Sequence, residues 1–202
     1  MSVVLVDAGG SNLGSVHAAL GRLGVDAPVT GDPTRIRNAT HVILPGVGAA
    51  AVAMARLQAQ GLVTLIRELR QPVLGVCVGM QILYEHSEEG DTLGLGVLPG
   101  RVRRLQGGPG LRVPHMGWND LQAHDRPHPL LAGLVDQYAY FVHSFAAPLS
   151  GDTLLSCEHG ERFTAMAANG NFHGAQFHPE RSAATGARLL QNFLELTGGD
   201  AA

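Results

Sequence analysis

Short apolar runs alternate with segments of helical periodicity along the first half of the chain. The apolar runs predict buried strands over residues 3–6, 25–29, 41–44 and 72–76. Apolar residues at helical spacing predict helices over residues 13–23, 49–70 and 78–85, the second broken near Gly61. Apolar strands that alternate with helices are typical of a parallel sheet covered on both faces, so the expected fold class is α/β.

From Gly94 onward the pattern changes to short strands separated by turn signals. These strand candidates cover residues 97–105, 111–121, 137–145, 153–158, 163–168 and 171–177. Asn169-Gly170, between the last two, is a strong signal for a tight hairpin. This half therefore predicts an antiparallel addition to the sheet, closed by an amphipathic helix over residues 182–196. No linker or internal repeat divides the chain, so residues 1–202 are expected to form a single domain.

Composition narrows the class of protein. The 202 residues are 45% hydrophobic and 15% charged, which favours a folded chain with a buried core. A net charge of −3 does not favour binding to nucleic acid or to an anionic membrane. All 14 basic residues are arginine, which excludes a Schiff-base lysine and a P-loop lysine.

Cysteine usage and the apolar runs indicate a setting inside the cell. Two cysteines are too few for a disulfide framework or a four-cysteine zinc site, and no metal site is expected. The N-terminus lacks the basic region of a signal peptide, and no apolar run reaches the length of a membrane span. We therefore expect a reducing, cytoplasmic environment.

The sharpest candidate for chemistry is Gly75-Val76-Cys77-Val78-Gly79, between a predicted strand and a helix. It has the form of a nucleophile elbow, with cysteine as the nucleophile. The tight turn requires glycines, and the helix N-terminus after it offers an oxyanion donor. Pro45-Gly46-Val47-Gly48, after the third strand, lets backbone N–H groups approach a ligand and would suit the same oxyanion. The alternatives are a buried structural cysteine and a plain strand-to-helix turn.

A nucleophilic cysteine needs a base, and the base needs a group that orients it. Phe177-His178-Pro179-Glu180, at the end of an apolar run, offers both. Two residues so close can orient each other only if the backbone bends. A surface His–Glu pair is the alternative, because ten histidines make accidental pairs common, and His115, His143 and His173 compete as bases.

These three segments together resemble the class I (triad) glutamine amidotransferases, which carry the nucleophile in an elbow and a His-Pro-Glu near the C-terminus. Further segments are similar to the glutaminase subunits of imidazole glycerol phosphate synthase, in that family's order: residues 7–13, 44–48, 75–81, 113–119 and 140–145. The more specific of them are Pro114-His115-Met116-Gly117-Trp118-Asn119 and His143-Ser144-Phe145. The resemblance implies a mixed, mostly parallel central sheet flanked by helices, with antiparallel strands added in the second half.

The resemblance also implies a reaction. Glutamine would be hydrolysed to glutamate and ammonia without a cofactor, and the ammonia would pass to a (β/α)8-barrel cyclase subunit in a heterodimer. There it would serve the formation of imidazole glycerol phosphate and AICAR in histidine biosynthesis. The implied catalytic residues are Cys77 as nucleophile, His178 as general base and acid, and Glu180 as the residue that orients His178.

Other implied site residues fall into three groups. They are Gly46, Val47, Gly48 and Val78 at the oxyanion; Gln81, Ser144 and Phe145 at the substrate; and Asn12, Trp118, Tyr140, His143 and Arg181 at the partner interface. Arg181 stands where many relatives carry lysine, so the interface contacts are expected to differ. A free-standing γ-glutamyl hydrolase and a non-catalytic activating subunit are the alternatives, and the intact triad argues against the second. Cys157, away from every motif, is expected in the core.

Overall fold

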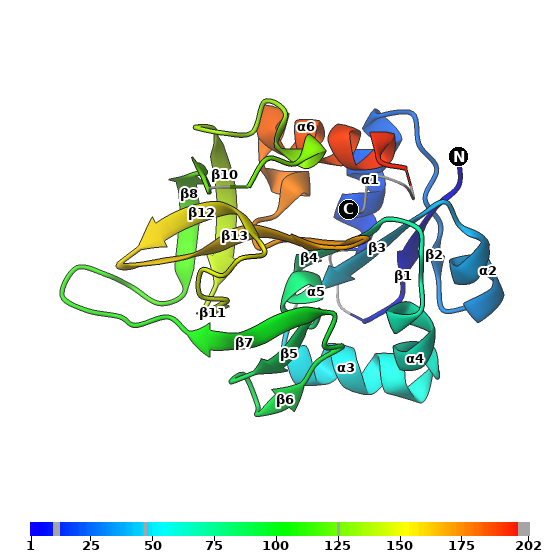
Figure 1. Ribbon diagram of the computed structural model, residues 1–202, viewed down its shortest axis with the longest axis horizontal. Coiled ribbons are helices and arrows are strands. Elements are labelled where there is room, and N and C mark those ends of the chain that lie inside the picture. The colour runs from blue at the N-terminus through cyan, green and yellow to red at the C-terminus, as the bar shows by residue number, and fades with distance from the viewer. Residues whose placement is uncertain (10–12, 47, 125, 198–202) are drawn as a thin grey trace.

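The computed structural model describes residues 1–9, 13–46, 48–124 and 126–197 (Figure 1). An eight-stranded sheet runs through it in the order β2-β1-β3-β4-β14-β13-β12-β9. Its parallel strands are β2 (Val29–Thr30), β1 (Val3–Val6), β3 (His41–Gly46), β4 (Val73–Cys77) and β14 (Phe172–Ala175). Its antiparallel strands are β13 (Glu161–Asn169), β12 (Thr153–His159) and β9 (Gln122–Ala123). The predicted mixed, mostly parallel sheet is thus confirmed.

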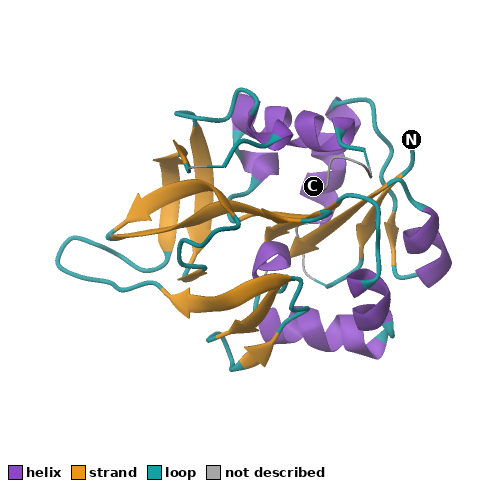
Figure 2. Ribbon diagram, viewed as in Figure 1, coloured by secondary structure: helices purple, strands orange, loops and turns teal. Residues whose placement is uncertain are grey.

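Helices cover both faces of this sheet, with α1 and α6 on one face and α3 and α4 on the other (Figure 2). The helices are α1 (Leu13–Arg22), α2 (Pro33–Asn38), α3 (Ala50–Ala59), α4 (Leu62–Arg67), α5 (Val78–Gln81) and α6 (Ala183–Glu195). Two short 3-10 turns are η1 (Pro129–Leu131) and η2 (Pro179–Arg181). The predicted break near Gly61 is confirmed, because this glycine adopts a left-handed φ of 68° between α3 and α4.

Two smaller sheets correct the prediction that all later strands join the main sheet. One pairs β8 (His115–Asp120) with β10 (Tyr138–His143). The other contains β11 (Phe145–Ala146), β7 (Leu98–Arg104), β5 (Tyr84–Ser87) and β6 (Thr92–Leu93).

Several element boundaries also differ from the predictions. The strand expected over residues 137–145 is split into β10 and β11, which belong to different sheets. The helix expected over residues 78–85 ends at Gln81, because the chain from Tyr84 pairs with β6 and β7. The strands expected over residues 25–29 and 111–121 are shorter, starting at Val29 and His115. Each of these starts directly after a proline, which cannot donate a hydrogen bond to a strand ladder.

The position of β14 matters most for the site. It follows β13 through the predicted hairpin at Asn169-Gly170, yet on its other side it pairs in parallel with β4. In that register Ala175 lies opposite Val76. Since parallel neighbours end at the same edge of a sheet, the residues after β14 emerge beside the end of β4. The topology therefore brings His178 to Cys77.

Candidate active site

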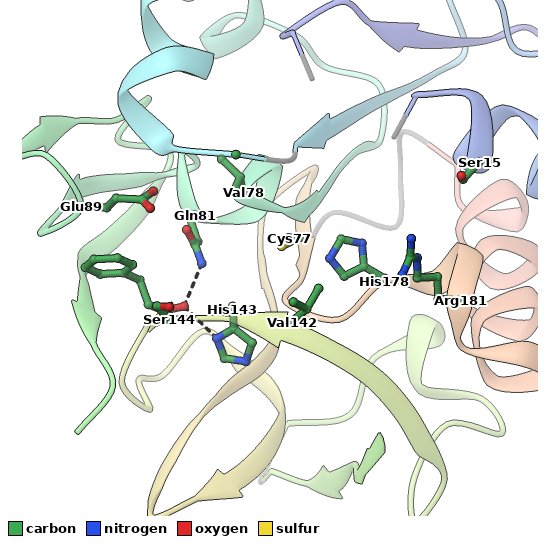
Figure 3. A pocket seen from close by; sticks show the side chains of 12 residues that line it. Ser15, Cys77, Val78, Gln81, Glu89, Val142, His143, Ser144, His178 and Arg181 are labelled. Carbon is green, nitrogen blue, oxygen red and sulfur yellow. Dashed lines mark hydrogen bonds between the residues drawn. The ribbon is translucent and has the colours of Figure 1, made fainter. Parts of the chain in front are cut away.

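Cys77 ends β4 in a strained backbone conformation. Its φ of 53° and ψ of −111° lie outside the regions that residues other than glycine usually adopt. Strain of this kind persists only where the surrounding structure imposes it, and it is concentrated at functional sites. The turn presents Cys77 to a cavity of about 420 Å³ (Figure 3). A cavity of this size is typical of small-molecule sites.

Three glycines pack so closely around this elbow that none of them has room for a side chain. A Cβ atom on Gly75 would lie 2.5 Å from the carbonyl oxygen of Gly79. Cβ atoms on Gly79 and Gly46 would overlap the backbone of Leu44 and of Gly79 respectively. Because Gly46 also pairs with Cys77 across β3 and β4, the end of β3 is pressed against the nucleophile turn.

The predicted oxyanion residues lie around this turn where the structure describes them. Gly48 and Val78 line the cavity, and Gly46 ends β3 beside it. Gly48 has a φ of 92°. Helix α5 has only four residues, so the N–H groups of one turn, rather than a long helix dipole, face the site. Val47 lies outside the described residues, as does Asn12 of the predicted interface, and their roles stay predictions.

His178 and Glu180 form a buried pair, not a surface pair. His178 Nδ1 donates to Glu180 Oε1 at 2.8 Å, and the two side chains are 4% and 0% exposed. The 3-10 turn η2 bends the backbone between them, which lets residues only two apart meet. The ring of His178 lies next to Cys77 (Figure 3). Burial alone would lower the pKa of His178, but its interactions with Cys77 and Glu180 raise that pKa to about 10.

Ser182 ties this histidine to β10, and the sequence motifs did not mark it. Its Oγ donates to the His178 carbonyl at 2.7 Å and accepts from the Tyr140 N–H at 2.9 Å. The His178 N–H in turn donates to the Tyr140 carbonyl at 2.9 Å. Since Ser182 is fully buried, these bonds fix the base relative to β10.

A second wall of the cavity carries the predicted substrate residues. Gln81, Ser144 and Phe145 all line it. Gln81 Nε2 donates to the Phe145 carbonyl at 2.8 Å and to Gln176 Oε1 at 3.0 Å. Gln176 was missed from the sequence, although its Nε2 lies 3.8 Å from Cys77 Sγ. The available signal was its place two residues before His178, on the same side of an extended chain.

Glu89 is another cavity residue that sequence reasoning missed. It lies in the turn between β5 and β6 and lines the cavity. Its Oε2 accepts a hydrogen bond from the N–H of Ala50, the first residue of α3, at 2.7 Å. This bond orients the carboxylate, which suits a substrate with a cationic group. No motif surrounds Glu89, so the fold alone identifies it.

The competing histidines take other positions. His143 lines the cavity but is 6% exposed, so it offers little surface to a partner, and its Nδ1 bonds the Phe145 carbonyl. His115 and His173 are buried and are not among the residues that line the cavity. Cys157 is fully buried, as its predicted core role requires, and burial raises its pKa to about 12.

The other predicted interface residues, Trp118, Tyr140 and Arg181, share one surface with Met116 and Tyr138, which the sequence did not mark; we call these five residues the β8–β10 face. Trp118 and Tyr140 are paired across the two strands, with ring centroids 6.1 Å apart. The Arg181 guanidinium lies 5.9 Å from the centre of the Tyr140 ring. Met116, Trp118 and Tyr138 are large exposed apolar side chains. An exposed cluster of this kind is typical of a protein interaction site.

Within the described part of the chain, no three His, Cys, Asp or Glu side chains are placed to share a metal ion. No described helix is long and apolar enough to cross a bilayer.

Comparisons with known proteins agree with this geometry. The family "Glutamine amidotransferase class-I" matches residues 4–196. A relative from Xanthomonas axonopodis pv. citri (strain 306), named imidazole glycerol phosphate synthase subunit HisH, is 59% identical over 96% of this chain and 98% of its own length. A relative of the same name from Xylella fastidiosa (strain Temecula1 / ATCC 700964) is 56% identical over 96% and 97%.

Solved structures support the fold. A structure described as a glutamine amidotransferase superposes with a TM-score of 0.75 at 24% identity, covering 98% of this chain and all of that one. PurLQS from Thermotoga maritima gives a TM-score of 0.70 at 20% identity over 96% and 98% of the two chains. Sequence match and fold agree: the chain belongs to the class-I glutamine amidotransferase family and, within it, to the HisH subunits of imidazole glycerol phosphate synthase.

Proposed function

We propose that this chain is the glutaminase subunit of an imidazole glycerol phosphate synthase and hydrolyses glutamine to glutamate and ammonia. The observation that carries the proposal is the cysteine on a strained elbow, beside a buried His178–Glu180 pair, at the edge of the cavity. Residues 1–202 act as one glutamine amidotransferase domain, because the family match extends from residue 4 to residue 196. The reaction belongs to histidine biosynthesis in the cytoplasm.

The triad performs the chemistry in two stages. Cys77 gives its proton to His178, and its sulfur attacks the side-chain amide carbon of glutamine. The tetrahedral oxyanion accepts hydrogen bonds from Val78 and from the segment Gly46–Gly48. His178 then protonates the departing ammonia, and Cys77 is left joined to the glutamyl carbon in a thioester. A water molecule, deprotonated by His178, hydrolyses the thioester to glutamate and returns the proton to Cys77, while Glu180 keeps the ring oriented.

The cavity also accounts for recognition of the amino acid. Glu89 presents a fixed carboxylate to the α-ammonium group of glutamine. On the other wall, Gln81 and the backbone of Ser144 and Phe145 bind the remaining polar groups. The substrate thus lies between a negative end and the nucleophile, which orients its side-chain amide toward Cys77.

The β8–β10 face docks the (β/α)8-barrel cyclase subunit. Its aromatic and apolar side chains are the types that dominate protein interfaces. Arg181 belongs to this face and also lines the cavity, so the face and the site of ammonia release are contiguous. Ammonia therefore leaves the cavity toward the partner.

A glutaminase assay on three samples tests the proposal: the chain alone, the chain with the cyclase subunit, and the complex with the cyclase's nucleotide ligand. We expect weak activity alone and strong activity in the liganded complex. Full activity without the cyclase would identify a free-standing hydrolase. No activity in any sample would identify a non-catalytic activating subunit.

A further inference from the structure

A chain of hydrogen-bonded side chains leads from β8 to the cavity wall. Asn119 Nδ2 lies 3.3 Å from His115 Nε2, and His115 Nδ1 lies 3.1 Å from His143 Nε2. His143 Nδ1 lies 2.9 Å from the Phe145 carbonyl oxygen. The same oxygen accepts the hydrogen bond from Gln81, so two side chains converge on one carbonyl (Figure 3). The catalytic steps proposed above use neither His115 nor His143.

The bonding pattern fixes the direction of every hydrogen bond in this chain. The Phe145 oxygen can only accept, so His143 Nδ1 carries the proton. Burial lowers the pKa of His143 to about 3 and that of His115 to about 4, so both rings are neutral near pH 7. A neutral imidazole has one N–H, so His143 Nε2 accepts and His115 Nδ1 donates. His115 Nε2 then accepts from the amide of Asn119.

Aromatic neighbours hold both rings in these orientations. His115 is stacked between Phe141 and His159, at centroid distances of 4.9 and 4.1 Å. His143 meets the ring of Phe163 edge-on at 5.0 Å. Because the rings are clamped, neither can turn away without moving its neighbours. The row of hydrogen-bonded side chains from Asn119 to the Phe145 carbonyl is therefore a rigid connection.

The two faces of β8 place one end of this connection beside the exposed surface and the other beside the cavity wall. Side chains alternate along a strand, so Met116 and Trp118 point to one side while His115 and Asn119 point to the other. Met116 and Trp118 are exposed on the β8–β10 face, and His115 is buried toward the cavity wall. A displacement of β8 at its exposed side therefore carries His115 and Asn119 with it.

We propose that His115 and His143 are positioning residues that couple the docking strand β8 to the substrate wall at Phe145 and Gln81. The proposal rests on the proposed function, because it takes the wall to bind glutamine and the strand to dock the cyclase. The histidines hold the Phe145 carbonyl, and that carbonyl holds the Gln81 amide. Docking thereby sets the position of the wall on which glutamine lies.

Substitutions at His143 in the chain–cyclase complex test the positioning role. His143→Phe removes both hydrogen bonds, and we expect a roughly tenfold rise in the KM for glutamine with kcat within about threefold of wild type. His143→Asn keeps a donor for the Phe145 carbonyl and should restore KM to within about threefold. A merely structural defect would reduce the amount of active enzyme, which lowers kcat and leaves KM unchanged. That result would overturn the proposal.

His41→Phe is the matched control. His41 is equally buried and bonds a backbone carbonyl, that of Leu196, at 3.1 Å. It starts β3, at the opposite end from Gly46 and the cavity. The variant should lose stability in thermal unfolding but keep the wild-type KM. An equal rise in KM in this variant would show that the His143→Phe effect is unspecific, and would overturn the proposal.

A double-mutant cycle tests whether His115 acts through His143. His115→Phe should raise KM by up to about threefold in the wild-type background, as much as His143→Asn, which loses the same link to His115, and should raise it no further in His143→Asn. Additive effects would overturn the coupling. Nitrogen NMR of the histidine rings should find both as Nδ1–H tautomers, and Nε2–H or charged rings would also overturn it. A wild-type complex without glutaminase activity would instead refute the proposed function. The NMR result would still decide which ring nitrogens of His115 and His143 donate hydrogen bonds.

Discussion

Replacing Glu180 with glutamine tests the triad with little change of shape. The side chain of Glu180 is fully buried and that of His178 is 4% exposed, so water cannot reach the imidazolium and compensate for the loss of the carboxylate charge. Their 2.8 Å hydrogen bond is charge-assisted and worth about 1.5–3 kcal/mol. At about 1.4 kcal/mol per pKa unit, its loss should lower the pKa of His178 by about one to two units from its value of about 10.

The Glu180→Gln variant should lose activity for the same reason. The amide can turn its NH2 group toward the ring and stabilise the wrong tautomer, so we expect kcat to fall by roughly 10²–10⁴-fold. Steady-state glutaminase kinetics of the complex between pH 6 and pH 11 measure this directly. The alkaline limb of the profile should move to lower pH, because the imidazolium loses its proton earlier. A kcat within about threefold of wild type and an unmoved limb would refute the role of Glu180.

The same pair makes the stability of the fold depend on pH. The folded-state pKa of His178, about 10, lies above its ordinary value of 6.5. The protonated ring therefore stabilises the fold fully below about pH 6.5, and this contribution is lost as the pH rises through about 10. Denaturant unfolding should show the largest stability gap between wild type and Glu180→Gln near pH 6.5 and a narrower gap near pH 10. A gap that did not change with pH would contradict the raised pKa.

Three further predictions follow from the site. A glutamine-like diazo-ketone should label Cys77 and not Cys157, as peptide mass spectrometry can check, and Cys77→Ser should lose activity without unfolding; labelling of Cys157 alone would refute the assignment. Gly48→Val has room for its side chain but would place a β-branched residue at a φ of 92°, so it should cost about 1–2 kcal/mol of stability and lower kcat in the cyclase complex while the complex still forms; a wild-type kcat would argue against a role of Gly48 at the oxyanion. Ser182→Ala leaves the Tyr140 N–H without its acceptor, the fully buried Ser182 hydroxyl, which should cost about 1–3 kcal/mol in denaturant unfolding and lower kcat; wild-type values for both would refute the role of Ser182 in fixing His178.

Local signals carried most of what the sequence could predict. The glycines of the elbow are required by contacts with backbone only a few residues away or on the neighbouring strand, so their pattern is visible in Gly75-Val76-Cys77-Val78-Gly79. Buried parallel strands are mostly apolar, which made residues 3–6, 41–44 and 72–76 recognisable. In each case the information lies within a short window of the chain.

The elements and site residues that the sequence did not predict depend on contacts between residues far apart along the chain. Nothing around residues 84–87 indicates a strand, because that strand depends on β7, more than ten residues away. The parallel pairing of β14 with β4 joins residues about a hundred positions apart. Three site residues were missed because each is placed in the site by a partner that only the fold brings near, and no motif surrounds them: Glu89, Gln176 and Ser182.

The aromatic pair on the β8–β10 face has an optical consequence. Trp118 is the single tryptophan of the chain, and it is 52% exposed. The emission of an indole moves to shorter wavelength when water around it is replaced by protein. The intrinsic tryptophan fluorescence of the isolated chain therefore comes from one point on its surface, next to Tyr140. The protein carries its own reporter at the place where docking is expected, so association can be followed without attaching a dye.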